Sequence, residues 1–188
     1  MEDYRVANER VVWKTPVLQT RWHPPDPSHF KMNVDAANFN DLRAMGTGMV
    51  LRDSQGVVLA PMCKRILANL SVLDAEAKSM EIAVQFAWEL GFREVYFEMN
   101  SSTLKNILTG LSDAPASLET VTDNILAQLD RFRFVSFCHV KREGNRPAHI
   151  LAQFAKQVGD FVVWLEETPN LIENTCSQDV APFISEVI

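Results

Sequence analysis

The segment from Phe30 to Phe39 places the strongest constraint on the fold, because its side chains alternate along its length. One side carries Phe30, Met32, Val34 and Ala36, and the other carries Lys31, Asn33, Asp35 and Ala37. This period of two predicts a strand. Two further apolar runs, GTGMVLRD and GVVLAPMCKR, flank turn residues 53–56 and predict a hairpin. The folded region therefore begins with three antiparallel strands.

Helices and strands then alternate along the chain. Asp74 can cap a helix that runs to about Leu90 and stops at Gly91. The aromatic and β-branched residues of 94–99 predict a strand, and Ser101 or Ser102 can cap a helix through Leu111. A helix over 118–131, a strand over 132–140 and a helix from near Asn145 to about Val158 complete the order. This order predicts an α/β domain with a mixed five-stranded sheet and helices packed on it.

The two ends lack such periodicity. Residues 1–29 contain Pro16, Pro24, Pro25 and Pro27 and predict an irregular lead-in or linker that joins the domain through Trp22. Residues 30–165 form the predicted domain. Residues 166–188 show no sustained period and are expected to be a flexible tail.

Composition limits the partners of the chain. The apolar fraction of 47% suffices for a core, but the net charge of −6 argues against binding nucleic acid by bulk electrostatics. Any nucleic-acid contact must then be local. Three cysteines without metal-ligand spacing favour an intracellular compartment, nuclear or cytoplasmic. No apolar run is long enough to span a membrane, so no membrane partner is expected.

Two acids occupy positions where acids are unusual. Glu76 shares its helix side with Met80, Ala83 and Ala87, and a carboxylate near the core needs a cation, a metal or strong donors. The alternative is an acid at a helix start, stabilised by the helix dipole. Asp35 lies in mid-strand and must likewise be paired or neutralised.

Glu98 and Asn100 mark the end of the strand over 94–99. The period of two places both on one side, where the strand runs into a helix. In open α/β sheets, functional sites gather at such strand ends. The alternative for Asn100 is a turn or capping residue, and for Glu98 a paired strand acid.

Five motifs in order, NVDAA, GMVLRDSQG, DAEAKSMEIAVQFA, VYFEMNSS and VKREGNRPAHILAQFA, carry a family resemblance. Over residues 22–165 the chain resembles the plant branch of the ribonuclease H-like family, which occurs in plant retroelement polyproteins and as separate short proteins. The resemblance implies a sheet whose first three strands are antiparallel and whose later strands are parallel. It places the strand of Asp35 beside that of Asn100, with the Glu76 helix leaning over both.

The resemblance also implies a chemistry, because active members gather four carboxylates that hold two Mg²⁺ and cleave the RNA strand of RNA–DNA hybrids. Asp35 and Glu76 match the first two carboxylates. Asn100 stands at the third position, where Asp is usual, and His149 at the fourth, where plant-branch members often have His. Asn145 matches a polar position that in the family lies near the bound strands.

These two substitutions alter the expected site. Mg²⁺ prefers anionic oxygen, and Asp35 and Glu76 supply only two negative charges against the four positive charges of two ions. We therefore expect weak or absent cleavage, with Mg²⁺ or Mn²⁺ held weakly by Asp35 and Glu76. His149 is a poor Mg²⁺ ligand but could shuttle a proton. Glu98 lies roughly 7 Å further back along the strand, a distance that its side chain covers only in part, so a paired strand acid is favoured over a replacement for the missing carboxylate.

The basic residues Lys141, Arg142 and Arg146 cluster before the last helix. They could contact phosphates, or they could be an ordinary solvated surface. Three functions stay open: a weakened metal-dependent RNA–DNA hybrid ribonuclease, an inactive nucleic-acid-binding module, and a protein-interaction domain that retains only the fold.

Overall fold

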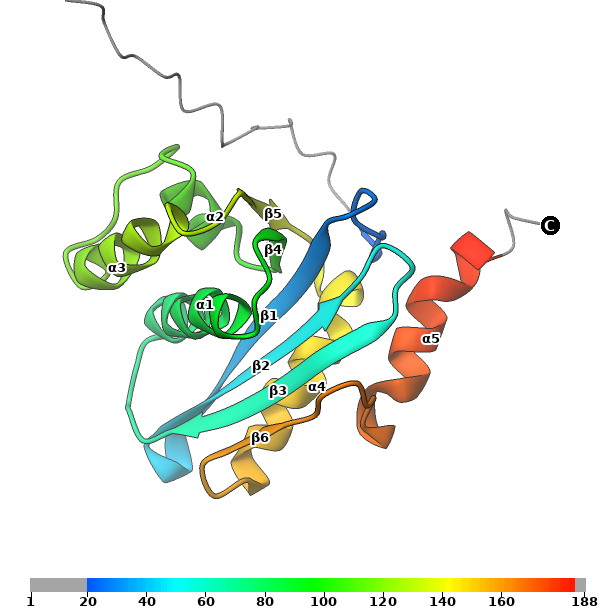
Figure 1. Cartoon of the computed structure of the whole chain (residues 1–188). Coiled ribbons are helices and arrows are strands. Elements are labelled where there is room, and N and C mark those ends of the chain that lie inside the picture. Colours follow the sequence, from blue (N-terminus) through cyan, green and yellow to red (C-terminus); the bar gives the residue numbers. More distant parts are fainter. Residues whose placement is uncertain (1–19, 185–188) are drawn as a thin grey trace, which may run out of the picture.

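A mixed six-stranded sheet forms the centre of the computed structural model, which describes residues 20–184 (Figure 1). Its strands, in the spatial order β5-β4-β1-β2-β3-β6, are β1 (Phe30–Phe39), β2 (Ala44–Arg52), β3 (Val58–Ile66), β4 (Glu94–Met99), β5 (Phe134–His139) and β6 (Phe161–Val163). β1, β2 and β3 are antiparallel, whereas β4 and β5 run parallel to β1. The expected α/β sheet is confirmed, and β6 adds a short antiparallel edge beside β3.

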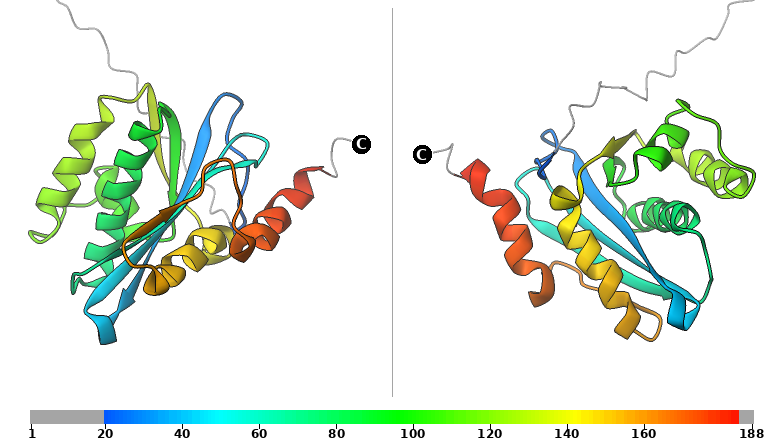
Figure 2. Two further views of the ribbon diagram at one scale, coloured as in Figure 1. Left: turned by 60° about the horizontal axis from the view of Figure 1, so that its bottom comes forward. Right: turned by 180° about the vertical axis from the view of Figure 1, so that it is seen from behind.

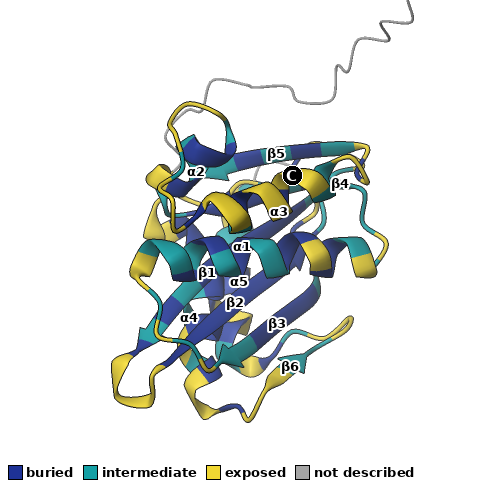
Figure 3. Cartoon of the chain, turned by 90° about the vertical axis from the view of Figure 1, so that its left-hand side faces the viewer, coloured by how far each residue is buried: buried dark blue, intermediate teal, exposed yellow. Residues whose placement is uncertain are grey.

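Helices cover both faces of this sheet (Figure 2). α1 (Val72–Glu89), α2 (Ser102–Leu108) and α3 (Glu119–Leu129) lie on one face, and α4 (Arg146–Phe154) and α5 (Asn170–Ile184) lie on the other. Short 3-10 turns are η1 (Asn40–Leu42), η2 (Arg142–Asn145) and η3 (Ala155–Gln157). Figure 3 shows buried residues along the central strands and exposed ones on the outer side of α3. Each face of the sheet therefore has its own hydrophobic core.

Strand β1 is buried on both faces, and its two sides differ in chemistry. Met32 and Val34 join the core beneath α1. On the other side, Lys31, Asn33 and Asp35 are all buried toward α4 and the lead-in. Because buried polar groups need partners, each of these three side chains is hydrogen-bonded, and Asp35 is part of the site described below.

Helix α4 packs directly on β2 through two glycines. A Cβ added at Gly48 would lie 2.2 Å from both the Ala148 carbonyl oxygen and the Ala152 backbone nitrogen, and one at Gly46 would meet the Ala152 carbonyl oxygen equally closely. Only glycine permits this approach of helix and strand. The approach brings His149 of α4 within reach of Asp35 on the neighbouring strand.

Helix ends differ slightly from the sequence prediction. α1 begins at Val72 because the Ser71 hydroxyl, not Asp74, caps it by accepting from the Asp74 backbone N–H. α2 ends at Leu108, before Gly110 adopts a left-handed conformation with φ of 70°. The predicted helix through Leu111 is therefore one turn too long.

The expectation of a flexible tail over residues 166–188 is corrected by α5. Ile172 and Cys176 of this helix are buried in the core beside α4, and Asp179 forms an ion pair with Arg52. Packing against α4 and the ion pair with β2 stabilise this weakly periodic segment as a helix.

The lead-in is described only from residue 20, so its first 19 residues lie outside the described part, as do residues 185–188. Residues 20–29 contain no helix or strand, and Trp22 is buried with 1% of its surface exposed. Within the described part, no helix is both long and apolar enough to cross a membrane.

Candidate functional site

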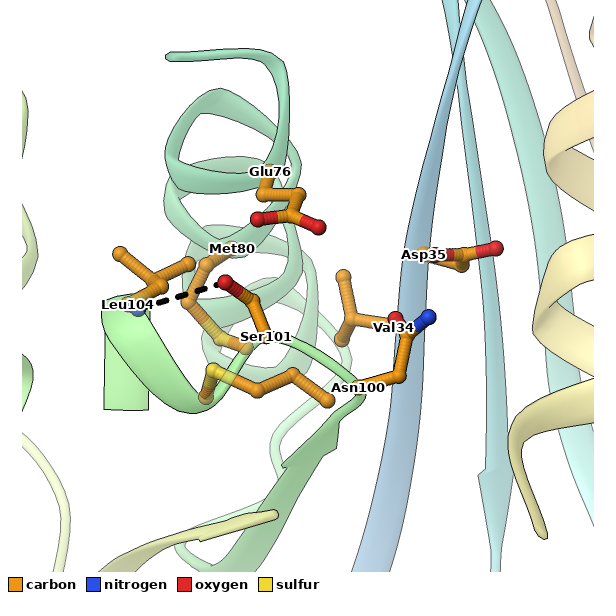
Figure 4. A pocket seen from close by; sticks show the side chains of 8 residues that line it. Val34, Asp35, Glu76, Met80, Asn100, Ser101 and Leu104 are labelled. Carbon is orange, nitrogen blue, oxygen red and sulfur yellow. Dashed lines mark hydrogen bonds between the residues drawn. The ribbon is translucent and has the colours of Figure 1, made fainter. Parts of the chain in front are cut away.

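Asp35, Glu76 and Asn100 line one pocket at the end of strand β4, together with Val34, Met80, Met99, Ser101 and Leu104 (Figure 4). Asp35 lies in β1 and Glu76 in α1, and Asn100 is the residue that follows β4. β1 and β4 are parallel neighbours in which Asn33 lies opposite Glu98, so Asp35 and Asn100, each two residues further on, lie level with each other where β4 ends. The structure thus brings together the three side chains that the sequence singled out.

Asp35 is paired with His149. The Nδ1 atom of His149 lies 2.7 Å from Oδ2 of Asp35, and an ionised carboxylate can only accept, so the imidazole N–H donates. Asp35 is 6% exposed. Its burial raises its pKa, and the hydrogen bond from His149 opposes that rise. The mid-strand acid therefore has the partner that its position requires.

Glu76 is half-buried on the opposite side of the pocket. Burial raises its pKa, a hydrogen bond with the Ser101 side chain opposes the rise, and the charge of Asp35 adds to it. Ser101 also caps α2, because its hydroxyl accepts from the Leu104 backbone N–H at 3.3 Å. Sequence reasoning identified Ser101 only as a cap, since its contact with Glu76 is long-range.

A hydrogen bond from β5 fixes the backbone at Asn100. The ring nitrogen Nε2 of His139 donates to the Asn100 carbonyl oxygen at 3.3 Å. The parallel pairing of β4 with β5 places His139 opposite Met99 and makes this contact possible. His139 therefore has a structural contact that fixes the rim of the pocket.

The donor set does not fit a pair of Mg²⁺ ions. Within residues 20–184, no group of three or more His, Cys, Asp or Glu side chains is placed to hold a metal ion. Asp35 and Glu76 offer the only carboxylates among the residues that line the pocket, Asn100 offers a neutral oxygen, and Oδ2 of Asp35 is already bonded to His149. The negative charge of these side chains would be too small to balance the positive charge of two adjacent divalent ions.

Glu98 does not replace the missing acid. It is fully buried, lies 2.9 Å from the Lys31 ammonium, and accepts a hydrogen bond from Asn33 at 2.8 Å. The alternative of a paired strand acid is therefore confirmed. The carboxylate compensates Lys31, so it has no charge to spare for a metal ion.

Asn145 requires a correction, because it was expected near bound nucleic-acid strands. Its side chain is 0% exposed, donates to the Val34 carbonyl oxygen at 2.8 Å and accepts from Asn33 at 3.1 Å. A fully buried amide cannot contact a strand in solvent. Asn145 instead ties the start of α4 to β1, next to Asp35.

Lys141, Arg142 and Arg146 are all exposed around η2. Arg142 lies near enough to Asp35 to lower the pKa of that carboxyl. Within the described range, none of the three cations is part of a salt bridge. They remain available to a ligand that approaches the pocket from the η2 side.

A family model described as reverse transcriptase-like matches residues 33–155. The chain belongs to this family. The matched segment begins within β1, ends after α4 and contains every side chain of the pocket. Residues 20–32, β6 and α5 lie outside the matched segment.

Solved structures share the ribonuclease H fold of this reverse transcriptase-like chain. Ribonuclease H1 from the halophilic archaeon Halobacterium salinarum is 24% identical with a TM-score of 0.65, covering 69% of this chain and 98% of that one. The N-terminal ribonuclease H domain of a Mycobacterium tuberculosis protein is 21% identical with a TM-score of 0.63, covering 69% and 94%.

The LC11 ribonuclease H1, solved in complex with an RNA/DNA hybrid, is 22% identical with a TM-score of 0.62, covering 67% and 95%. At these identities the likeness establishes the fold. The search among curated proteins gave no match.

Proposed function

We propose that this chain is a ribonuclease H-like domain that binds RNA–DNA hybrid and whose strand-cleaving activity is weakened or lost. The observation that carries the proposal is the pairing of Asp35 with His149 beside the neutral Asn100. Two of the four positions that hold carboxylates in active members, by the resemblance of the motifs, are thus occupied by an amide and an imidazole. The fold is retained while the negative charge of the site is halved.

The charge of the site sets how strongly a metal ion can bind. Dehydration of Mg²⁺ is unfavourable unless anionic oxygens replace its water. We propose that Asp35 and Glu76 hold at most one Mg²⁺ or Mn²⁺ ion, and hold it weakly. The hydrogen bond from His149 must also be given up or shared before Asp35 Oδ2 can turn to a metal ion.

Hybrid binding in this proposal is local, because the chain carries a net charge of −6. The exposed cations Lys141, Arg142 and Arg146 supply the phosphate contacts on one side of the pocket. The LC11 ribonuclease H1, whose fold this chain shares, was solved with an RNA/DNA hybrid, which supports the same class of ligand here. The motifs further support an origin in a plant retroelement, and the free cysteines support a reducing nuclear or cytoplasmic compartment.

The test is cleavage of a labelled RNA–DNA hybrid in Mg²⁺ and in Mn²⁺. We expect little or no cleavage by the wild-type chain and a gain for Asn100→Asp, with a larger gain when His149→Asp is added. Asn174→Asp, on the exposed side of α5, adds the same charge elsewhere and serves as the control. Measurable cleavage by the wild-type chain, at a rate equal to that of the double variant, would refute the loss of activity.

A second candidate is a protein-interaction domain that retains only the fold. The net charge of −6 and the pI of about 5.2 favour it, since acidic chains bind nucleic acid poorly. Direct titration of hybrid at low salt separates the two candidates. Absence of binding there would refute the first candidate and leave the second.

A further inference from the structure

The lead-in crosses directly over the turn η2. A Cβ added at Gly144 would lie 2.8 Å from the Arg21 carbonyl carbon and 2.9 Å from the Trp22 backbone nitrogen. Position 144 therefore has room only for hydrogen, and the backbone of residues 21–22 rests on the turn. Arg21 is thus brought beside the turn that carries Arg142 and leads into Arg146, although it lies far from both in the sequence.

Trp22 anchors this crossing. Its indole is buried, the Arg52 guanidinium lies 4.0 Å from its ring centroid, and Phe183 of α5 meets it edge-on at 6.4 Å. The next residue is fixed as well, because Lys31 donates to the His23 carbonyl oxygen at 2.6 Å. In the right-hand view of Figure 2, residues 20–29, the start of α4 and the C-terminal end of α5 lie at the same end of the molecule. Arg21 is therefore presented from an anchored backbone.

The anchored residue itself is exposed and cationic. Within residues 20–184, no salt bridge involves Arg21, Lys141, Arg142 or Arg146, and Glu143 is the one acid in η2. In a chain of net charge −6, four exposed cations beside one turn form a local positive surface. Arg142 acts on the pKa of Asp35, which places this surface at the border of the pocket.

We propose that Arg21 contacts a phosphate of the bound nucleic acid and extends the surface formed by Lys141, Arg142 and Arg146. A guanidinium suits this role because it donates two parallel hydrogen bonds to phosphate oxygens. Arg21 lies outside the segment matched by the family model, which begins at residue 33. The inference rests on the proposed hybrid binding, and it assigns part of that binding to a residue outside the matched segment.

The experiment is a titration of labelled RNA–DNA hybrid at several salt concentrations, from about 50 to 300 mM KCl. Loss of one phosphate contact lowers the slope of log affinity against log salt by about 0.7 to 0.9. We expect this change for Arg21→Gln, with binding at about 100 mM KCl weakened roughly five- to eightfold. Arg21→Lys should keep most of the slope, because the charge remains.

Arg133→Gln is the control, because Arg133 is also exposed but precedes β5, at the end of that strand opposite to η2, where it forms an ion pair with Glu94. A slope unchanged in Arg21→Gln, while Arg142→Gln and Arg146→Gln each lower it, would overturn the inference and leave the proposed function intact. An equal loss in Arg21→Gln and Arg133→Gln would also overturn it. A wild-type chain that binds no hybrid at the lowest salt would overturn both proposals.

Discussion

Asp179 is expected to be a major stabilising residue, because it is the counter-ion of a fully buried arginine. Nη1 of Arg52 lies 2.8 Å from Oδ2 of Asp179, and the aspartate side chain is 13% exposed. Removal of one partner from a buried ion pair destabilises a protein by about 3–5 kcal/mol. In Asp179→Ala, however, Arg52 keeps its hydrogen bond to Asn33 at 2.7 Å and its stacking on Trp22. We therefore place the loss at about 2–3 kcal/mol.

The assay is thermal unfolding followed by circular dichroism at neutral pH. For a chain of this size, each kcal/mol lost from the free energy of unfolding lowers Tm by roughly 2–4 °C, so Asp179→Ala should lower Tm by about 4–12 °C. The double variant Arg52→Met, Asp179→Leu should recover much of the loss, because no buried charge is left unpaired. The control is Asp41→Ala, which breaks the exposed pair with Lys156 and should leave Tm unchanged. Equal, small shifts in Asp179→Ala and Asp41→Ala would refute the reasoning.

Two further predictions concern the pocket and the packing beneath it. Glu76→Gln should raise Tm at neutral pH, because burial and the charge of Asp35 hold the folded-state pKa of Glu76 above its ordinary value of 4.5. When the pKa of an acid is higher in the folded state than in the unfolded state, the free energy of unfolding falls as the pH rises from the unfolded-state pKa to the folded-state pKa. The gain in Tm for Glu76→Gln should therefore vanish in melts recorded below both pKa values. Gly48→Ala should lower Tm by several degrees, because overpacking against the α4 backbone costs about 1–3 kcal/mol or more.

Each of these variants has a matched control. Glu173→Gln removes an exposed acid in α5 and should leave Tm unchanged at every pH. Gly159→Ala adds the same methyl group where no atom lies within 4 Å, and it should be tolerated. A fall in Tm for Glu76→Gln at neutral pH, or equal melts for the two alanine variants, would contradict the structural account.

The local pattern of the sequence was sufficient to predict most of the secondary structure of the domain. The alternation over residues 30–39 predicts β1 with the bounds that the structure has, and the turn at 53–56 predicts the hairpin of β2 and β3. The alternation and the turn each depend only on residues that are close in the sequence, so they can be recognised before the fold is known. The pocket was predictable by a different route, since the motifs around Asp35, Glu76 and Asn100 carry the family resemblance and parallel strands bring them to one edge.

Contacts between distant segments were not predictable in this way. The family resemblance placed Asn145 near bound strands, yet Asn145 is buried and hydrogen-bonded to Val34 and Asn33. Glu98 has the pattern of a site acid, yet Lys31 neutralises it. In both cases the partner lies more than sixty residues away, so no local periodicity signals it.

The sequence by itself determined the strands, most of the helices and the identity of the residues in the pocket, because hydrophobic periodicity and motif order are local properties of the chain. Only the tertiary structure decided that residues 170–184 form a helix, that Arg52 and Asp179 pair across the core, and that Arg21 lies beside η2. The physical reason is that a buried charge or a weakly periodic helix is stable only against its partner, and folding alone brings that partner into contact.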